Sequence, residues 1–373
     1  MKRYLLLSYL LISGFLASQD VENKAIPAGY YDGATGTGYT LKTQLKTIIT
    51  QNHTAIGYSG LWTLYRTTSA FNDNWYEKDN TLLDIYSEVP NGVDPYVYEV
   101  GYNQCGNYSK EGDCYNREHL IPQSIFKSND PMYSDAFHIW PTDGYVNGRR
   151  DNFPFGKVGY ATWTSKNGSM LGTNLNSGYS SGYSKTVFEP IDEFKGDIAR
   201  AYFYFATRYE DQITSWGVNY DMFNKTKDQV FTDTFKNILL TWHTMDPVSD
   251  REIALNEVVY GNQNNRNPFI DHPEWVKVIW GSAMGTEDFN YQPRDFLEVY
   301  PTLSTNGIIY IKSKDIKAKI LKVSVFNMNG ILVQSVNNPS KLSELSIRIY
   351  GSGVYIIKVY GNDFEVNRKV IVK

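Results

Sequence analysis

The composition of the chain changes near residue 298, and this change limits the possible folds more than any other feature. Residues 298–373 contain short β-rich runs such as VSVFNMNGILV and GSGVYIIKVY. Asn-Gly and Gly-Ser-Gly turns separate the runs, as in antiparallel hairpins. We therefore predict a small all-β sandwich over residues 298–373, separate from a larger domain before it. Taken alone, the segment could also be a carbohydrate-binding or adhesive module.

The N-terminus has the pattern of a secretory signal. Lys2 and Arg3 precede the apolar run YLLLSYLLISGFLA, which is too short to span a bilayer as a stable helix. We predict a signal peptide over residues 1–18, with cleavage near Ala17 or Ser18, and a secreted protein. No later stretch contains enough consecutive apolar residues for a membrane helix, so we expect no stable membrane insertion.

The chain has two cysteines, Cys105 and Cys114, which are close in sequence. Export determines whether they are oxidised. In an oxidising compartment this pair predicts a disulfide. A zinc site is disfavoured, because no further His or Cys residues stand at a matching spacing. The bridge would restrict the loop that leads to Glu118 and His119.

Residues 19–297 mix helical and strand-like patterns, which predicts an α+β domain. LLDIYS at residues 82–87 is strand-like, whereas apolar residues recur at helical spacing in several segments. The helical segments are residues 40–50, 192–214, 232–244 and 251–260.

Residues 116–156 of this domain hold a set of residues suited to phosphodiester cleavage. The stretch begins NREHLIPQSIF and, after a polar spacer, continues DAFHIWPTDGYVNGRRDNFPFG. Histidine titrates near neutral pH, so His119 suits a general base. Glu118 offers a charged oxygen and Asn147 a neutral one, a small ligand set of the kind that Mg²⁺ takes from proteins. An arginine after Asn147 could hold a phosphoryl oxygen in bidentate fashion.

The second half of this stretch predicts a short strand over residues 137–140. It also predicts a helix over residues 143–151, with Thr142 as the N-cap. On such a helix Asn147 and Arg150 share a face. We therefore prefer Arg150 to its neighbour as the phosphate contact.

Glu118 and His119 pose a geometric difficulty, because neighbours in a regular strand point to opposite sides. Both can reach one site only if the strand ends, bulges or twists there.

Each of these residues also has an ordinary structural interpretation. A Glu-His pair commonly lies on the surface without a specific role, and an Asn-Gly-Arg-Arg run is commonly a solvated turn. His138 could be a histidine packed in the core. Residues 265–267 and His272 could line a nucleic-acid groove, or they could form a polar loop held by hydrogen bonds. Only the ordered combination within residues 116–156 favours a catalytic interpretation.

That combination resembles the endonuclease I family of secreted and periplasmic bacterial nucleases, which is similar in site plan to the ββα-metal (His-Me finger) nucleases. The resemblance covers most of residues 28–285, including YYDGATGTGYTLKTQLKTII, FEPIDEFKGDIARAYFYFATRY and NQNNRNPFIDHPEWVKVIWG. It implies a ββα-metal motif and cleavage of DNA, and often RNA, with little sequence preference and 5′-phosphate ends. We expect the protein to act as a monomer.

The resemblance also implies residue roles. His119 would be the general base, Glu118 and Asn147 the protein ligands of one Mg²⁺ or another divalent ion such as Ca²⁺ or Mn²⁺, and Arg150 a phosphate contact. One departure is visible, because Phe137 stands where the family often has a histidine.

The C-terminal segment resembles the sorting domain of the type IX secretion pathway, including its Tyr-Pro opening and basic end. This resemblance implies contact with the secretion machinery and a delivery signal that is often removed at the cell surface.

Charge argues against a broad electrostatic hold on nucleic acid. The formal net charge is −4, although residues 298–373 are rich in lysine, so the preceding domain is strongly acidic. Two other functions therefore remain open. One is a non-catalytic surface protein that binds nucleic acid or polysaccharide, and the other is a phosphodiesterase for small substrates.

Overall fold

The computed structural model describes residues 26–217, 219–281, 297–313, 320–327, 332–337, 344–361 and 365–373. These residues form two compact units, one on each side of residues 282–296. The first unit mixes helices with small sheets and the second is all-β, which confirms the predicted fold class. The expected signal peptide lies outside the described residues. No helix among these residues is long and apolar enough to cross a membrane.

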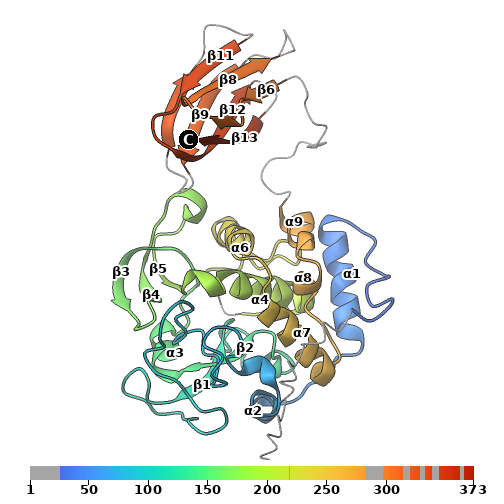
Figure 1. Ribbon diagram of the computed structural model, residues 1–373. Coiled ribbons are helices and arrows are strands. Elements are labelled where there is room, and N and C mark those ends of the chain that lie inside the picture. Colours follow the sequence, from blue (N-terminus) through green and yellow to red (C-terminus); the bar gives the residue numbers. More distant parts are fainter. Residues whose placement is uncertain are drawn as a thin grey trace, which may run out of the picture. The chain divides into compact units, whose positions relative to one another are not determined.

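Helix α4 (Lys195–Arg208) runs through the middle of the first unit (Figure 1). All 14 of its residues are buried, since α1 (Gly38–Gln51), α6 (Asp233–Met245) and α8 (Pro268–Asp271) pack around it. The sequence predicts one helix over residues 192–214. In the structure a 3-10 turn precedes α4, and the short α5 (Glu210–Ile213) follows it.

The other predicted helices are confirmed. Residues 40–50 and 251–260 lie within α1 and α7 (Asp250–Gln263), and the helix predicted over residues 232–244 is α6, which begins one residue later. Helix α7 begins with a capping box in which Ser249 and Glu252 satisfy each other's backbone amides. Two more helices are α2 (Tyr58–Thr67) and α9 (Glu274–Trp280).

Residues 82–87 are not the strand that the sequence predicts. The Asp84 carboxylate accepts hydrogen bonds from the backbone amides of Tyr86 (2.9 Å) and Asp143 (2.8 Å). The amides of Ser87 and Glu88 donate to the Asp84 carbonyl. Side-chain and backbone acceptors at Asp84 thus fold the segment into a turn, which overrides its strand propensity.

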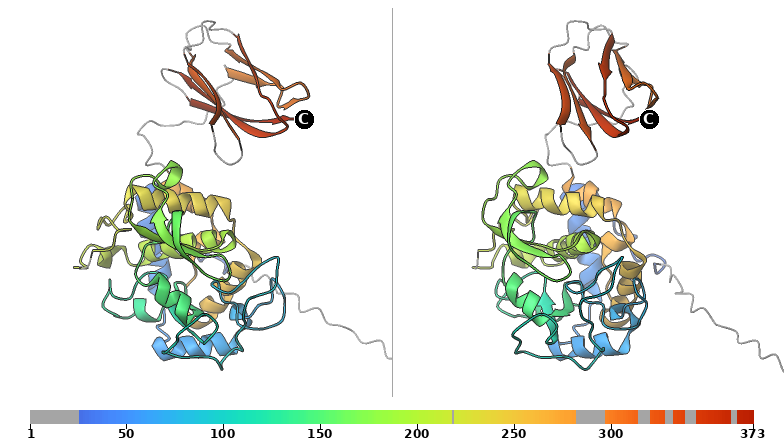
Figure 2. Two further views of the ribbon diagram at one scale, coloured as in Figure 1. Left: turned by 90° about the vertical axis from the view of Figure 1, so that its left-hand side faces the viewer. Right: turned by 60° about the vertical axis from the view of Figure 1, so that its left-hand side comes forward.

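The first unit contains two small antiparallel sheets. Strand β1 (Tyr115–His119) pairs with β2 (Ile139–Asp143), and helix α3 (Gly144–Arg150) follows directly. The other sheet has the order β3-β4-β5, formed by Val158–Thr164, Met170–Asn174 and Thr186–Glu189. Figures 1 and 2 show β1, β2 and α3 together on one side of α4, with α6 on the other side.

The second unit has sheets of order β10-β9-β12-β13-β7 and β11-β8-β6, around a core that includes Ile309, Ile311, Val325 and Ile357. One pairing departs from the antiparallel expectation, because β7 runs parallel to β13. The strands are β6 (Leu297–Tyr300), β7 (Leu303–Ser304), β8 (Ile308–Ser313), β9 (Ile320–Asn327), β10 (Leu332–Asn337), β11 (Glu344–Arg348), β12 (Gly353–Gly361) and β13 (Glu365–Val372).

Candidate active site

The unit β1-β2-α3 carries the residues singled out by the sequence. Strand β2 begins at Ile139 rather than at Phe137, and it continues through Pro141 to Asp143. Asp143, not Thr142, is the N-cap of α3, because its carboxylate accepts the amide of Val146 at 2.7 Å. The other Asp143 oxygen accepts the Tyr98 hydroxyl (2.6 Å) and thereby ties the start of α3 to a distant loop.

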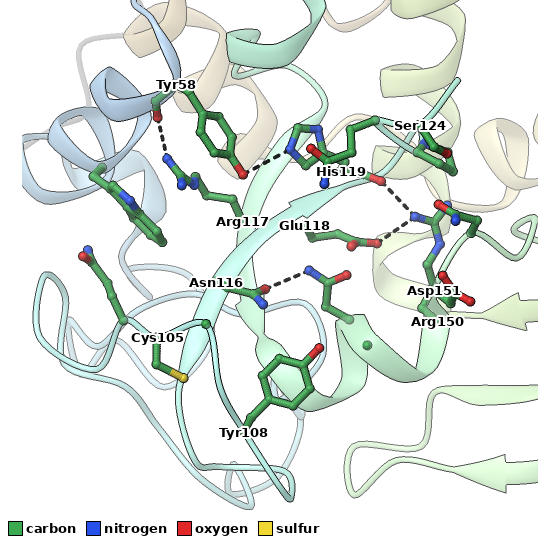
Figure 3. Close-up of a pocket in the computed structure, with 18 residues that line it drawn as sticks. Tyr58, Cys105, Tyr108, Asn116, Arg117, Glu118, His119, Ser124, Arg150 and Asp151 are labelled. Atoms are coloured by element: carbon green, nitrogen blue, oxygen red, sulfur yellow. Dashed lines mark hydrogen bonds and ion pairs between the residues drawn. The ribbon is translucent and has the colours of Figure 1, made fainter. Parts of the chain in front are cut away.

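Glu118 lies in the middle of the site with only 1% of its surface exposed. Its Oε1 accepts hydrogen bonds from the Tyr86 hydroxyl (2.9 Å) and from Arg150 Nη1 (3.2 Å), as Figure 3 shows for the arginine. Burial is the main influence and raises the pKa of Glu118, while Arg150 and Tyr86 oppose that shift. The carboxylate is therefore held in one orientation by two donors on the same oxygen.

Asn147 on α3 is oriented by Asn116 on β1. The Asn147 amide nitrogen donates to Asn116 Oδ1 at 2.8 Å, which is drawn as a dashed line in Figure 3. Because the nitrogen is engaged, the side-chain oxygen of Asn147 is left to accept or to ligate.

His119 closes β1 and packs in an aromatic stack. Its ring lies parallel to that of Tyr133, with ring centroids 5.4 Å apart, and its Nε2 is 3.4 Å from the Tyr58 hydroxyl. Its Nδ1 has no hydrogen-bond partner among the described residues. Burial first, and then His138, Arg117 and Arg150, hold the pKa of His119 well below its usual value. The imidazole is thus neutral near pH 7.

All four predicted site residues line one cavity of about 810 Å³, together with Tyr58, Trp62 and Arg117. The pairing of β1 with β2 is regular, without a bulge between Glu118 and His119. The strand ends at His119 and belongs to a two-stranded sheet, so the cavity can take side chains from both of its faces. Figure 3 shows Arg117 and His119 near Tyr58, and Glu118 near Arg150.

The sequence predicts that Arg150 contacts a substrate phosphate, but in the structure Arg150 binds groups of the protein itself. It is 1% exposed, and its terminal nitrogens donate to Glu118 and to the backbone carbonyls of His119 (2.8 Å) and Leu120 (2.7 Å). Arg149 is exposed, with its guanidinium 5.4 Å from the ring centroid of Trp163. In the structure Arg150 therefore braces Glu118 and the end of β1.

The predicted disulfide between Cys105 and Cys114 is confirmed. It closes a loop whose ends are attached to the site. Cys105 N donates to the Tyr115 carbonyl at the start of β1, and the Cys114 carbonyl accepts the amide of Gly144 at the start of α3. Tyr108 from this loop lies against Gly148, where any Cβ would collide with its ring.

Sequence reasoning missed three residues of the site. Tyr58 and Tyr86 come from segments remote from residues 116–156, and no local pattern marks them. Arg117 could have been found, since it alternates with His119 along β1 and so shares its face. Its guanidinium stacks on Tyr58 at 3.3 Å and on Trp62 at 4.4 Å, and it is only half-buried within the cavity.

Residues 265–267 form the polar loop held by hydrogen bonds, not a groove wall. Arg266 is buried and paired with Glu257 and Asp271, and Asn267 caps α8. His138 is likewise a packed core histidine, fully buried, and burial lowers its pKa to about 4.

The donor set fits a hard divalent cation. Among the described residues, Glu118 Oε2 and the side-chain oxygen of Asn147 accept no hydrogen bond, and both residues line the same cavity. One carboxylate and one amide oxygen, with the remaining positions filled by water and a phosphate, form a site typical of Mg²⁺.

Comparisons with known proteins define the class to which this structure belongs. The first unit is a nuclease domain. The second unit is a type IX secretion sorting domain. It matches the family described as "Secretion system C-terminal sorting domain" over residues 298–373. The chain belongs to the endonuclease I family, matched over residues 37–274. Members of this family generally depend on a divalent metal ion. The protein is thus a secreted nuclease.

Curated relatives agree with this assignment. The extracellular ribonucleases of Bacillus subtilis and Bacillus amyloliquefaciens are each 34% identical to the chain over 258 residues, covering 67% of it and 78% of the relative. An Endonuclease-1 of Buchnera aphidicola is 24% identical over 137 residues, covering 37% of this chain and 46% of the relative.

Proposed function

We propose that the protein is a divalent-metal-dependent endonuclease that hydrolyses DNA and RNA with little sequence preference and leaves 5′-phosphate ends. The observation that carries the proposal is the shared cavity of His119, Glu118 and Asn147. The neutral imidazole of His119 lines the same cavity as Glu118 and Asn147, whose Oε2 and side-chain oxygen accept no hydrogen bond among the described residues.

In this proposal the His119 imidazole takes a proton from a water molecule, which then attacks the phosphorus atom. The bond from phosphorus to the 3′ oxygen breaks, and that oxygen takes up a proton from solvent. Tyr58 and Tyr133 hold the imidazole, while Tyr86 and Arg150 hold Glu118. A divalent ion held by Glu118 and Asn147 would supply positive charge to the phosphoryl and leaving oxygens.

Arg117 is the cation that we assign to the substrate. Arg150 is enclosed by its own partners, whereas Arg117 is half-buried at the cavity wall. Its guanidinium can therefore reach a phosphate while its plane stays on Tyr58.

The substrate class follows from the same chemistry. The Bacillus relatives are named ribonucleases, which supports RNA as a substrate. A histidine that activates water does not need a 2′-hydroxyl, so DNA should be cut by the same route. End analysis is decisive, because attack by a 2′-hydroxyl would give 2′,3′-cyclic phosphates on RNA and no reaction with DNA.

Metal removal tests the proposed function directly. After dialysis against EDTA, cleavage of plasmid DNA should fall to background, and excess Mg²⁺ or Mn²⁺ alone should restore it. A chromogenic phosphodiester run in parallel distinguishes a small-substrate phosphodiesterase. Undiminished plasmid cleavage in EDTA would show that the metal-dependent mechanism is incorrect.

Replacing Tyr58 with phenylalanine should lower kcat about fivefold, the equivalent of one hydrogen bond of about 1 kcal/mol. The variant keeps the ring that stacks on Tyr133 and loses only the hydroxyl near His119 Nε2. Tyr102→Phe is the matched control, since Tyr102 is 74% exposed. Equal rates in the two variants would mean that the hydroxyl does not orient the imidazole.

A further inference from the structure

A cluster of three carboxylates lies outside the active-site cavity. Asp73, Glu77 and Glu88 each offer an oxygen, and these oxygens lie within 4.8 Å of one another. None of the three residues lines the cavity that contains His119. The cluster is therefore not part of the proposed catalytic site.

Glu88 supplies evidence beyond the clustering itself. It is 1% exposed, and its Oε1 has no hydrogen-bond partner among the described residues. A buried carboxylate oxygen without a partner is costly, because it has lost water and gained nothing in return. Because Glu88 belongs to the cluster, a cation bound there could supply the interaction that its carboxyl group lacks.

Negative charge at the cluster is not balanced by protein cations. Among the described residues, no ion pair includes Asp73, Glu77 or Glu88. Asp94 adds a further carboxylate close by. Burial, followed by the charges of Asp94, Glu77 and Asp73, raises the pKa of Glu88 to about 9.

The surrounding loop already holds Asp73 in place. Its Oδ1 accepts the amides of Trp75 (3.0 Å) and Tyr76 (2.9 Å), and its Oδ2 accepts that of Lys78 (3.0 Å). Glu77 is exposed, so the cluster is open to solvent on one side and an ion can enter.

We propose that Asp73, Glu77 and Glu88 form a second cation site, which binds Ca²⁺ and stabilises the fold. The ligands are all oxygens, and several carboxylates with room for water suit Ca²⁺, whereas Mg²⁺ keeps more of its own waters and Zn²⁺ prefers nitrogen or sulfur. A secreted protein meets calcium at concentrations that fill even weak sites, with Kd of about 10⁻⁴–10⁻³ M.

The site also has a physical connection to the catalytic centre. The Glu88 amide donates to the Asp84 carbonyl at 2.9 Å and closes the turn over residues 84–88. Tyr86, within this turn, donates its hydroxyl to Glu118. An ion bound to Glu88 therefore steadies the turn that holds Glu118.

Thermal unfolding of the full chain tests this proposal, with CaCl₂ added to protein first freed of metal. The test is made in a Glu118→Gln background, so that Ca²⁺ bound at the proposed catalytic site does not contribute. At about a hundredfold excess over Kd, Ca²⁺ should raise Tm by about 5–10 °C. Adding Glu88→Gln should abolish the rise, whereas the matched exposed change Glu99→Gln should leave it intact.

Two results would overturn the proposal. One is an unchanged Tm of the Glu118→Gln protein in about 0.1 M Ca²⁺, a hundredfold excess over the weakest Kd expected, and the other is a full Tm rise that survives Glu88→Gln. In EDTA the Glu88→Gln protein should be about as stable as its parent, because Glu88, with its pKa raised to about 9, is already uncharged near neutral pH when no ion is bound. If that variant does not fold, Glu77→Gln on the exposed side should weaken Ca²⁺ binding, measured calorimetrically, by at least about tenfold. The proposal does not depend on nuclease activity.

Discussion

Replacing His119 with alanine should lower kcat for plasmid cleavage by about a thousandfold, which is within the usual contribution of a general base. The variant removes the imidazole whose Nδ1 lacks a protein partner and leaves Glu118 and Asn147 in place. Mg²⁺ affinity measured by calorimetry should therefore change little. Added imidazole should restore part of the rate, because the space that His119 vacates beside Tyr58 and Tyr133 remains.

The matched control is His272→Ala, since His272 lies on the surface beside Glu274 and Trp275 and does not line the cavity. Its rate should equal that of the parent protein. If His119→Ala cleaved plasmid at the parental rate, the base assignment would be wrong and another group would have to activate the water.

Local patterns in the sequence were sufficient to predict part of this structure. The helices α1, α6 and α7 follow from apolar residues at helical spacing, and the all-β second unit follows from its turns. The disulfide follows from export and the proximity of the two cysteines. In each case the information lies within a few residues of the element that it determines.

Other features depend on contacts that no local pattern contains. LLDIYS has strand propensity, yet Asp84 accepts the amide of Asp143 and folds the segment into a turn. Thr142 and Asp143 are both acceptable N-caps, and Asp143 takes the position because Tyr98 and Gly112 hold its second oxygen.

The site was predictable as a set of residues but not as an arrangement. Glu118, His119, Asn147 and Arg150 do line one cavity, as their order in the chain suggests. Their supports, Tyr58 and Tyr86, are contributed by distant segments. The orientation of Arg150 toward the backbone of β1 follows from burial, which a helical projection cannot show.

Replacing Arg150 with methionine should therefore reduce stability as well as activity. The change leaves the Glu118 carboxylate buried without its cation and frees the carbonyl of His119, at a cost of about 3–5 kcal/mol in the free energy of unfolding. Denaturant unfolding measures this cost. Arg149→Met, one residue away and exposed, should change stability by no more than about 0.5 kcal/mol.

The double variant Arg150→Met with Glu118→Gln distinguishes two roles for Arg150, support of Glu118 and contact with the substrate phosphate. If Arg150 braces Glu118, the second change should recover part of the lost stability, because no charge then remains buried alone. If instead Arg150 holds the substrate phosphate, Arg150→Met should be as stable as Arg149→Met and show its defect as a raised KM. The first outcome assigns substrate binding to Arg117, which remains half-buried at the cavity wall with its guanidinium on Tyr58.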